Sequence, residues 1–190
     1  MNTPHTPHTP SPGSAGKGLT VTSPGNYPPI EVERPHLPYA RMLMGDLASS
    51  RSEMTAINQY LYQDWVVSAQ DAEFARVLRR IAQVEMRHLD ILGRLIVLLG
   101  GDPRCQALPG NRRSAWSGSF VEYAGAIPAM LQSDIRSEQF ARNTYLSQAN
   151  QVQDAKLSAV LRKLAADEDV HVNVFRHFLD QYQQEGPQGR

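Results

Sequence analysis

The sequence predicts an all-α protein built as an antiparallel four-helix bundle, and three observations support that prediction. Long stretches after Pro38 place apolar residues at i, i+3, i+4 and i+7, with few helix breakers. No apolar–polar alternation typical of a strand continues for a useful length. The amphipathic segment "VLRRIAQVEMRH" at 77–88 returns as "VLRKLAADEDVH" at 160–171, which indicates that two helices share one pattern.

Four helical segments follow the pattern, and a loop of roughly 20 residues separates the second from the third. They run from about Tyr39 to Ser68, from near Asp71 to the "GGDP" at 100–103, from about Pro128 (or earlier, near Val121) to Gln148, and from Asp154 to just before "EGPQGR". Two glycines and a proline are a strong stop for the second helix, and Asp154 is a suitable N-cap for the fourth. One longer central connection favours an antiparallel bundle.

The composition divides the chain into one domain with two tails. Residues 1–36 are rich in proline and lack aliphatic periodicity, so we expect a flexible tail that cannot bury enough apolar surface to order itself. The bundle should occupy residues 37–185, and residues 186–190 should form a short C-terminal tail. His5 and His8 in "TPHTPHTP" could bind a metal ion weakly, but solvated low-complexity sequence is the better interpretation.

Charge and hydropathy exclude several classes of protein. Nineteen basic and nineteen acidic residues cancel, so there is no basic excess for a nucleic acid and no polybasic block for an anionic membrane. The longest apolar stretch, "LDILGRLIVLLG", is too short to span a bilayer, and the N-terminus has no apolar core of a signal peptide. Cys105 is the only cysteine, which fits a reducing compartment. We therefore expect a cytoplasmic protein.

A second pair of similar segments extends the repeat to both halves of the chain. The segment "SEMTAINQYL" at 52–61 matches "SEQFARNTYL" at 137–146 in its Ser, Glu, Asn, Tyr and Leu positions. The first two helices therefore correspond to the last two, and a pseudo-twofold axis should relate the halves.

The repeated segments carry four glutamates and two histidines with the spacing of metal ligands. These residues are Glu53, Glu85, His88, Glu138, Glu168 and His171. Positions three apart share a helix face, so Glu85 and His88 can point to one spot, as can Glu168 and His171. The apolar neighbours Ile81, Leu92 and Leu164 place that spot inside the bundle. The alternative, a solvated surface Glu–His pair, does not explain two copies in matched segments.

Buried carboxylates without partners are very costly, and two divalent cations would neutralise four of them. One Glu from each of two helices, with a Glu-x-x-His from each of the other two, is the ligand set of dinuclear carboxylate bundles. Oxygen and nitrogen ligands without thiolate favour iron or manganese. By ligand count, Glu85 and Glu168 would bridge two metals. The remaining ligands would pair as Glu53 with His88 and Glu138 with His171.

Other residues near the motifs have weaker interpretations. Tyr60 and Tyr145 each lie seven residues after a candidate Glu, on the same helix face, and could hydrogen-bond a ligand or supply an electron. Their alternative is an ordinary place in the core. We expect His177 at the surface or in the lining of the site, Cys105 as a lone thiol and Trp116 as an anchor of the long loop.

The motifs resemble those of bacterioferritins over roughly residues 40–183. "SEMTAINQYL" resembles the family's first-helix motif, "EMRH" (85–88) its Glu-Met-x-His, and "DEDVH" (167–171) its final Asp/Glu-Glu-x-x-His. "MLQSDIRSE" (130–138) matches the segment that carries the third-helix ligand. The resemblance implies a ferritin-like fold with two iron ions, and a haem b held by Met86 at a subunit interface. The absent fifth helix, the longer loop and the extra N-terminal tail count against a storage cage.

The function expected from this resemblance is ferroxidase chemistry, in which ferrous iron is oxidised by O2 or H2O2 during iron storage and detoxification. A dimanganese, catalase-like peroxide scavenger is one alternative. A non-enzymatic metal-binding bundle is another. The long apolar second helix favours self-association into a homodimer or a larger oligomer.

Overall fold

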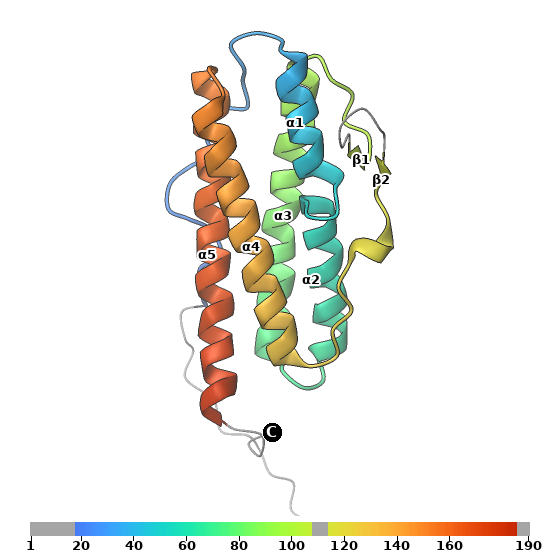
Figure 1. The fold of residues 1–190 in the computed structure, drawn as a ribbon. Coiled ribbons are helices and arrows are strands. Elements are labelled where there is room, and N and C mark those ends of the chain that lie inside the picture. The colour runs from blue at the N-terminus through green and yellow to red at the C-terminus, as the bar shows by residue number, and fades with distance from the viewer. Residues whose placement is uncertain (1–17, 108–113, 186–190) are drawn as a thin grey trace, which may run out of the picture.

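The computed structural model describes residues 18–107 and 114–185, which form an all-α bundle (Figure 1). The helices are α1 (Leu37–Ala48), α2 (Glu53–Val67), α3 (Ala72–Leu98), α4 (Ile127–Gln151) and α5 (Ala155–Glu185). The predicted fold class is confirmed. His5, His8 and the expected C-terminal tail at 186–190 lie outside the described residues.

The helices form two antiparallel pairs joined by one long connection (Figure 1). α1 and α2 run along α3 in the opposite direction, and α4 runs antiparallel to α5. Between α3 and α4 the chain returns along the whole bundle, through strands β1 (Gln106–Ala107) and β2 (Ser114–Ala115) and the 3₁₀ helix η1 (Gly118–Phe120). α3 and α4 consequently start at the same end, as they do in bundles with one long crossover.

The expected single helix from Tyr39 to Ser68 is wrong in one respect, because the chain breaks at Ser49–Ser52 and forms α1 and α2. Ser52 caps α2 by accepting a hydrogen bond from the backbone N–H of Thr55, and its hydroxyl donates to the carbonyl of Ser49. Short hydroxyl side chains compete in this way with helical backbone hydrogen bonds. The break makes Glu53 the first residue of α2.

The remaining predicted helix ends agree closely with the structure, except that α4 continues to Gln151, beyond the predicted end at Gln148. Asp71 caps α3 by accepting from two backbone N–H groups, and Asp154 accepts from the N–H of Leu157 at the start of α5. Gly100 follows α3 with φ 86°, a conformation that favours glycine. Of the two starts considered for the third helix, the one near Pro128 is confirmed, because Val121 has extended backbone after η1.

Two apolar clusters fill the interior of the described bundle, one toward each end. One contains Leu43, Leu92 and Leu161, and the other contains Ile81, Leu131 and Phe175. The polar layer described below lies between them in sequence: on α3 it follows Ala82 of the second cluster and precedes Ile91 of the first. The candidate ligands are therefore surrounded by apolar packing.

Residues 18–36, which we call the N-terminal strap, correct the expectation of a flexible tail up to residue 36. Val21 is buried in one apolar cluster, and Tyr27 and Ile30 pack against the other. The backbone N–H of Glu33 donates to Asp154 at 2.7 Å, at the start of α5. The proline-rich strap shows no helical or strand periodicity, so the sequence did not indicate that it is ordered. An extended segment can nevertheless bury isolated side chains against a helical bundle.

Within the described residues, no helix is both long enough and apolar enough to cross a membrane.

Candidate metal centre

The Glu-x-x-His motifs of α3 and α5 face each other inside the bundle. Glu85, His88 and His171 are fully buried, and Glu168 is almost so. Ile81, Leu92 and Leu164, whose pattern predicted this placement, are also fully buried. The predicted inward face of both motifs is confirmed.

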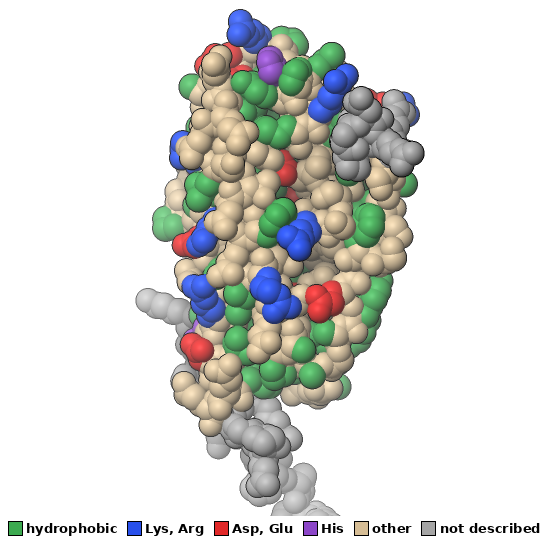
Figure 2. Space-filling model, viewed as in Figure 1, with side chains coloured by type: hydrophobic (Ala, Val, Ile, Leu, Met, Phe, Trp, Pro, Cys, Tyr) green, Lys and Arg blue, Asp and Glu red, His purple; other side chains and the backbone are tan. Residues whose placement is uncertain are grey.

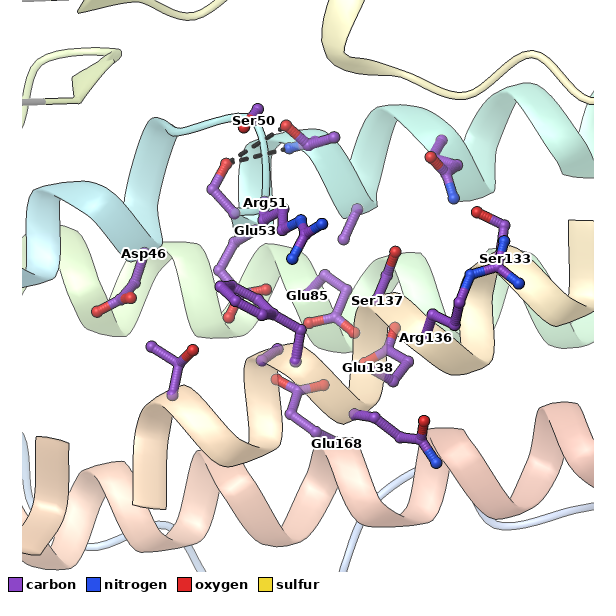
Figure 3. A pocket seen from close by; sticks show the side chains of 18 of the residues that line it. Asp46, Ser50, Arg51, Glu53, Glu85, Ser133, Arg136, Ser137, Glu138 and Glu168 are labelled. Carbon is purple, nitrogen blue, oxygen red and sulfur yellow. Dashed lines mark hydrogen bonds between the residues drawn. The ribbon is translucent and has the colours of Figure 1, made fainter. Parts of the chain in front are cut away.

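α2 and α4 supply one glutamate each to the same layer. Glu53 begins α2 and Glu138 lies within α4, and both are buried. Figure 3 shows the carboxylates of Glu53, Glu85, Glu138 and Glu168 converging on one region from four helices. The structure thus brings together all six residues that the sequence singled out.

The two bridging candidates each reach both imidazoles. Glu85 places one oxygen 2.9 Å from His88 Nδ1 and the other 2.8 Å from His171 Nδ1. Glu168 does the same at 3.1 Å and 3.1 Å. The imidazole rings lie side by side with centroids 6.2 Å apart.

Each of the other two glutamates lies near only one of the two imidazoles. Glu53 lies 3.7 Å from His88 Nδ1, and Glu138 lies 3.5 Å from His171 Nδ1. Two four-residue groups result, which share Glu85 and Glu168, and within each group the donor atoms lie within 4.8 Å of one another. This is the division into two shared and four single-sided ligands that the sequence predicted.

Several potential metal-binding atoms of this layer have no hydrogen-bond partner, and a bound metal would provide one. Both oxygens of Glu85, Nδ1 of His88 and one oxygen of Glu168 are buried and make no hydrogen bond. Burying such atoms unpaired carries a substantial free-energy penalty. Four carboxylates and two imidazoles with free lone pairs match the preferences of iron and manganese. The residues present therefore fit a dinuclear metal group.

The electrostatics of the layer indicate the same thing. Burial raises the pKa of Glu53 well above its ordinary value, and the charges of Glu85 and Glu168 raise it further. Burial also raises the pKa of Glu138 in the same way, together with Glu168 and Glu85. Without metal, two of the four carboxyls consequently favour their protonated form, because so many negative charges cannot share a dry interior.

The imidazoles offset the shared carboxylates. Burial alone would lower the pKa of His171. The charge of Glu85, together with hydrogen bonds to Glu138, Glu168 and Glu85, raises that pKa well above its ordinary value. Burial would raise the pKa of Glu85, but the positive charges of His171 and His88 outweigh it and hold that pKa low. Protons thus neutralise the layer in the absence of cations.

The two candidate tyrosines hydrogen-bond across the pseudo-twofold axis. Tyr60 of α2 donates to Glu138 of α4, and Tyr145 of α4 donates to Glu53 of α2. Both side chains are buried. Each tyrosine therefore holds the candidate ligand of the opposite half, whereas the sequence associated it with the glutamate of its own helix.

Sequence reasoning missed the groups behind the two imidazoles. His88 Nε2 lies 3.3 Å from Asp167, and His171 Nε2 lies 3.0 Å from the carbonyl oxygen of Val21. Asp167 occupies the repeat position that is Val84 in the other copy, and a carboxylate in place of a buried valine was a usable signal. Nothing in the proline-rich sequence around Val21 indicated its contact.

A cavity of about 570 Å³ leads from the surface to the carboxylates between α2 and α4. Its wall includes Glu53, Glu85, Glu138 and Glu168, together with Tyr60 and Tyr145. Arg51 and Arg136 also line it, with exposed side chains, and the Arg51 guanidinium stacks 4.7 Å above the ring of Phe140. Basic side chains gather over this face in Figure 2, and Figure 3 shows both arginines near the glutamates.

The remaining sequence candidates lie away from the centre. Met86 is 43% exposed on α3, and its predicted role in haem binding stays a prediction. His177 and Cys105 are exposed, as expected. Trp116 donates from its indole to Thr55 at 3.0 Å, which confirms that it anchors the long connection to α2.

The sequence profile of the ferritin-like domain matches residues 49–184, and the chain therefore belongs to the ferritin-like family. Its helices, crossover and converging carboxylates are those expected of this class.

Two kinds of relative share this fold. A probable manganese catalase of Clostridium acetobutylicum is 27% identical over 175 residues, which cover 83% of this chain and 77% of that protein. The crystal structure of a manganese catalase from Anabaena PCC7120 superposes with a TM-score of 0.74 at 23% identity, covering 84% of this chain and 80% of the other. The bacterioferritin of Rhodobacter capsulatus gives a TM-score of 0.66 at 25% identity, covering 82% and 92%.

Proposed function

We propose that this chain is a dinuclear metal enzyme that disproportionates hydrogen peroxide to oxygen and water. One observation carries the proposal: an open cavity ends at a buried layer in which both oxygens of Glu85, one oxygen of Glu168 and Nδ1 of His88 make no hydrogen bond. The sequence similarity to a probable manganese catalase supports it.

The geometry supports one assignment of metal-binding residues. Glu85 and Glu168 would bridge two ions, with Glu53 and His88 completing one position and Glu138 and His171 the other. Two redox-active ions would supply the two-electron change that converts two molecules of H2O2 into O2 and two of water. Tyr60 and Tyr145 hold Glu138 and Glu53 in place, and the apolar clusters exclude bulk water.

The cavity suits a small polar substrate. Arg51 and Arg136 carry permanent positive charge on its exposed wall, beside the exposed carboxylate of Glu122. Hydrogen peroxide is neutral and small, so neither charge opposes its entry, and the serine hydroxyls of the wall, such as Ser137, can hydrogen-bond it. The wall also includes the buried carboxylates of Glu53, Glu85, Glu138 and Glu168, so a substrate in the cavity would reach the candidate ligands.

Ferroxidase activity, the expectation from the sequence, is the second candidate, and the complete set of four glutamates and two histidines favours it. Ferrous iron would then be the substrate, with O2 or H2O2 as the oxidant. A haem b on Met86 belongs with this candidate, because that side chain is half-exposed and free to meet a second copy. Homo-oligomer formation and a cytoplasmic location stay predictions under either function.

The two candidate functions differ in the metal ion and in whether O2 is produced or consumed. Protein loaded with Mn(II) should evolve O2 from H2O2, and Glu53→Gln should abolish this while Glu73→Gln, an exposed glutamate of α3, should not. Oxygen evolution would be followed with an electrode, and metal content by elemental analysis. Consumption of O2 upon addition of Fe(II), without oxygen evolution from the Mn(II) form, would contradict the catalase proposal and favour the ferroxidase. Absence of both reactions would identify a non-enzymatic metal bundle.

A further inference from the structure

The two candidate histidines are held from behind by different chemical groups. Nδ1 of each faces the carboxylates, so Nε2 is the nitrogen that faces outward. For His88 the outward partner is the carboxylate of Asp167 at 3.3 Å, and for His171 it is the carbonyl oxygen of Val21 at 3.0 Å. Both partners accept hydrogen bonds, so both place the ring proton on Nε2 and leave Nδ1 free for a metal.

The N-terminal strap orients the Asp167 carboxylate. The Ser23 backbone N–H and hydroxyl donate to one oxygen of Asp167 at 2.6 Å each, and the Tyr27 hydroxyl donates to the other at 2.5 Å. Lys163 donates to Asp167 at 2.9 Å and also to the carbonyl of Ser23 at 2.9 Å. Asp167 has no exposed surface, so this network fixes its position.

Tyr27 is itself fixed by two cations. The Arg87 guanidinium lies 3.9 Å from the centroid of the Tyr27 ring, and Lys163 Nζ lies 4.8 Å from it. The Tyr27 hydroxyl is also 3.5 Å from His88 Nε2. The strap therefore contacts both histidines. Val21 contacts His171 directly, and Tyr27 reaches His88 both directly and, like Ser23, by way of Asp167.

We propose that the N-terminal strap is a structural part of the metal centre and makes its two metal positions inequivalent, with tighter binding at the position of Glu53 and His88. A carboxylate behind an imidazole makes its free nitrogen a stronger donor than a neutral carbonyl does. The inference rests on the proposed dinuclear site. Asp167, Tyr27 and Ser23 act as positioning residues, because they reach the metal only through His88.

The test is an anaerobic titration of the full metal-free chain with Co(II) alone, followed by absorbance and calorimetry. Wild-type protein should bind two ions in two resolved steps. Asp167→Asn should weaken the tighter step by about 10- to 100-fold, the range for such outer partners, and leave the weaker step unchanged. Tyr27→Phe, which removes one hydrogen bond to the same carboxylate, should weaken that step by a smaller factor. Glu31→Gln breaks the strap's exposed pair with Lys156 and should change neither step.

Anomalous scattering from Co(II)-loaded crystals assigns each step to a position. At half saturation the wild-type signal should be greater beside His88 than beside His171, and Asp167→Asn should reverse or equalise it. Identical steps in the wild type, or equal loss from both positions in Asp167→Asn and Tyr27→Phe, would overturn the inference while leaving the dinuclear site intact. Failure of the wild type to bind Co(II) would instead contradict the proposed function. Circular dichroism of each metal-free variant shows whether it folds. If Asp167→Asn does not fold, the titration of Tyr27→Phe tests the inference in its place.

Discussion

At the scale of single residues, the six candidate ligands could be predicted because the segments that carry them occur twice in the sequence. Glu85 and His88 share one helix face by spacing alone, and the apolar neighbours fix that face inward. Asp167 was harder to assign, since its partners Ser23 and Tyr27 come from a segment more than 130 residues away in sequence. Contacts between such distant segments, without periodicity on one side, leave no local signal beyond the change from Val84 to Asp167 between the two repeat copies.

Asp134 is another buried carboxyl, and it lies outside the set of candidate ligands. One of its oxygens accepts hydrogen bonds from Gln59 at 2.7 Å and Gln63 at 3.0 Å, while the other has no partner. Burial raises the pKa of Asp134 to about 7; the two glutamines and Arg136 lower it, and Glu122 raises it. Asp134 therefore keeps its proton in the folded chain up to a pH at which the unfolded chain has lost it.

This difference makes stability depend on pH in a predictable direction. Between about pH 4 and pH 7 the folded state binds more protons at Asp134 than the unfolded state, so the free energy of unfolding falls as pH rises. Asp134→Asn removes this loss, and its stability relative to the wild type should improve by roughly 2 kcal/mol between pH 5.5 and pH 8. Urea unfolding of the metal-free proteins measures it. Asp90→Asn, an exposed control, should show no such gain, and an equal gain there would contradict the assignment.

At the scale of elements, the four long helices were predictable, and the break between α1 and α2 was not. The apolar stripe from Leu43 to Leu61 continues across the break, so periodicity predicted one helix. The hydroxyls of Ser52 and Thr55 both donate to the carbonyl of Ser49. In a continuous helix this carbonyl would instead accept a hydrogen bond from a backbone N–H. Capping by serine can be recognised in sequence, but it competes with a periodic signal that is stronger.

Gly101, just after α3, illustrates how closely α1 approaches the end of that helix. A Cβ at this position would lie 2.8 Å from the side chains of both Ala40 and Ile96. Gly101→Ala should therefore lower the free energy of unfolding by about 1–3 kcal/mol through overpacking. Gly93→Ala, inside α3 with open space around the added methyl, should raise it by about 0.5–1 kcal/mol. Chemical denaturation compares the two, and equal effects of the same sign would contradict this packing.

At the scale of the whole molecule, the ferritin-like architecture follows from the sequence and the strap does not. Repeated amphipathic helices and one long connection determine the bundle. The strap has no helix or strand of its own and packs against the helices, so its order depends on tertiary contacts. The cavity likewise could not be predicted from the sequence, because its arginines come from separate segments, the break before α2 and α4.

The central claim is that six buried side chains hold two metal ions in one chain. The most direct measurement is the mass of the folded chain by native mass spectrometry after equilibration with Mn(II) or Fe(II) under anaerobic conditions. We predict two ions per wild-type chain, and loss of both in Glu85→Gln, because Glu85 reaches both positions. A wild-type chain that binds no ion, or a Glu85→Gln chain that retains two with unchanged affinity, would contradict the account.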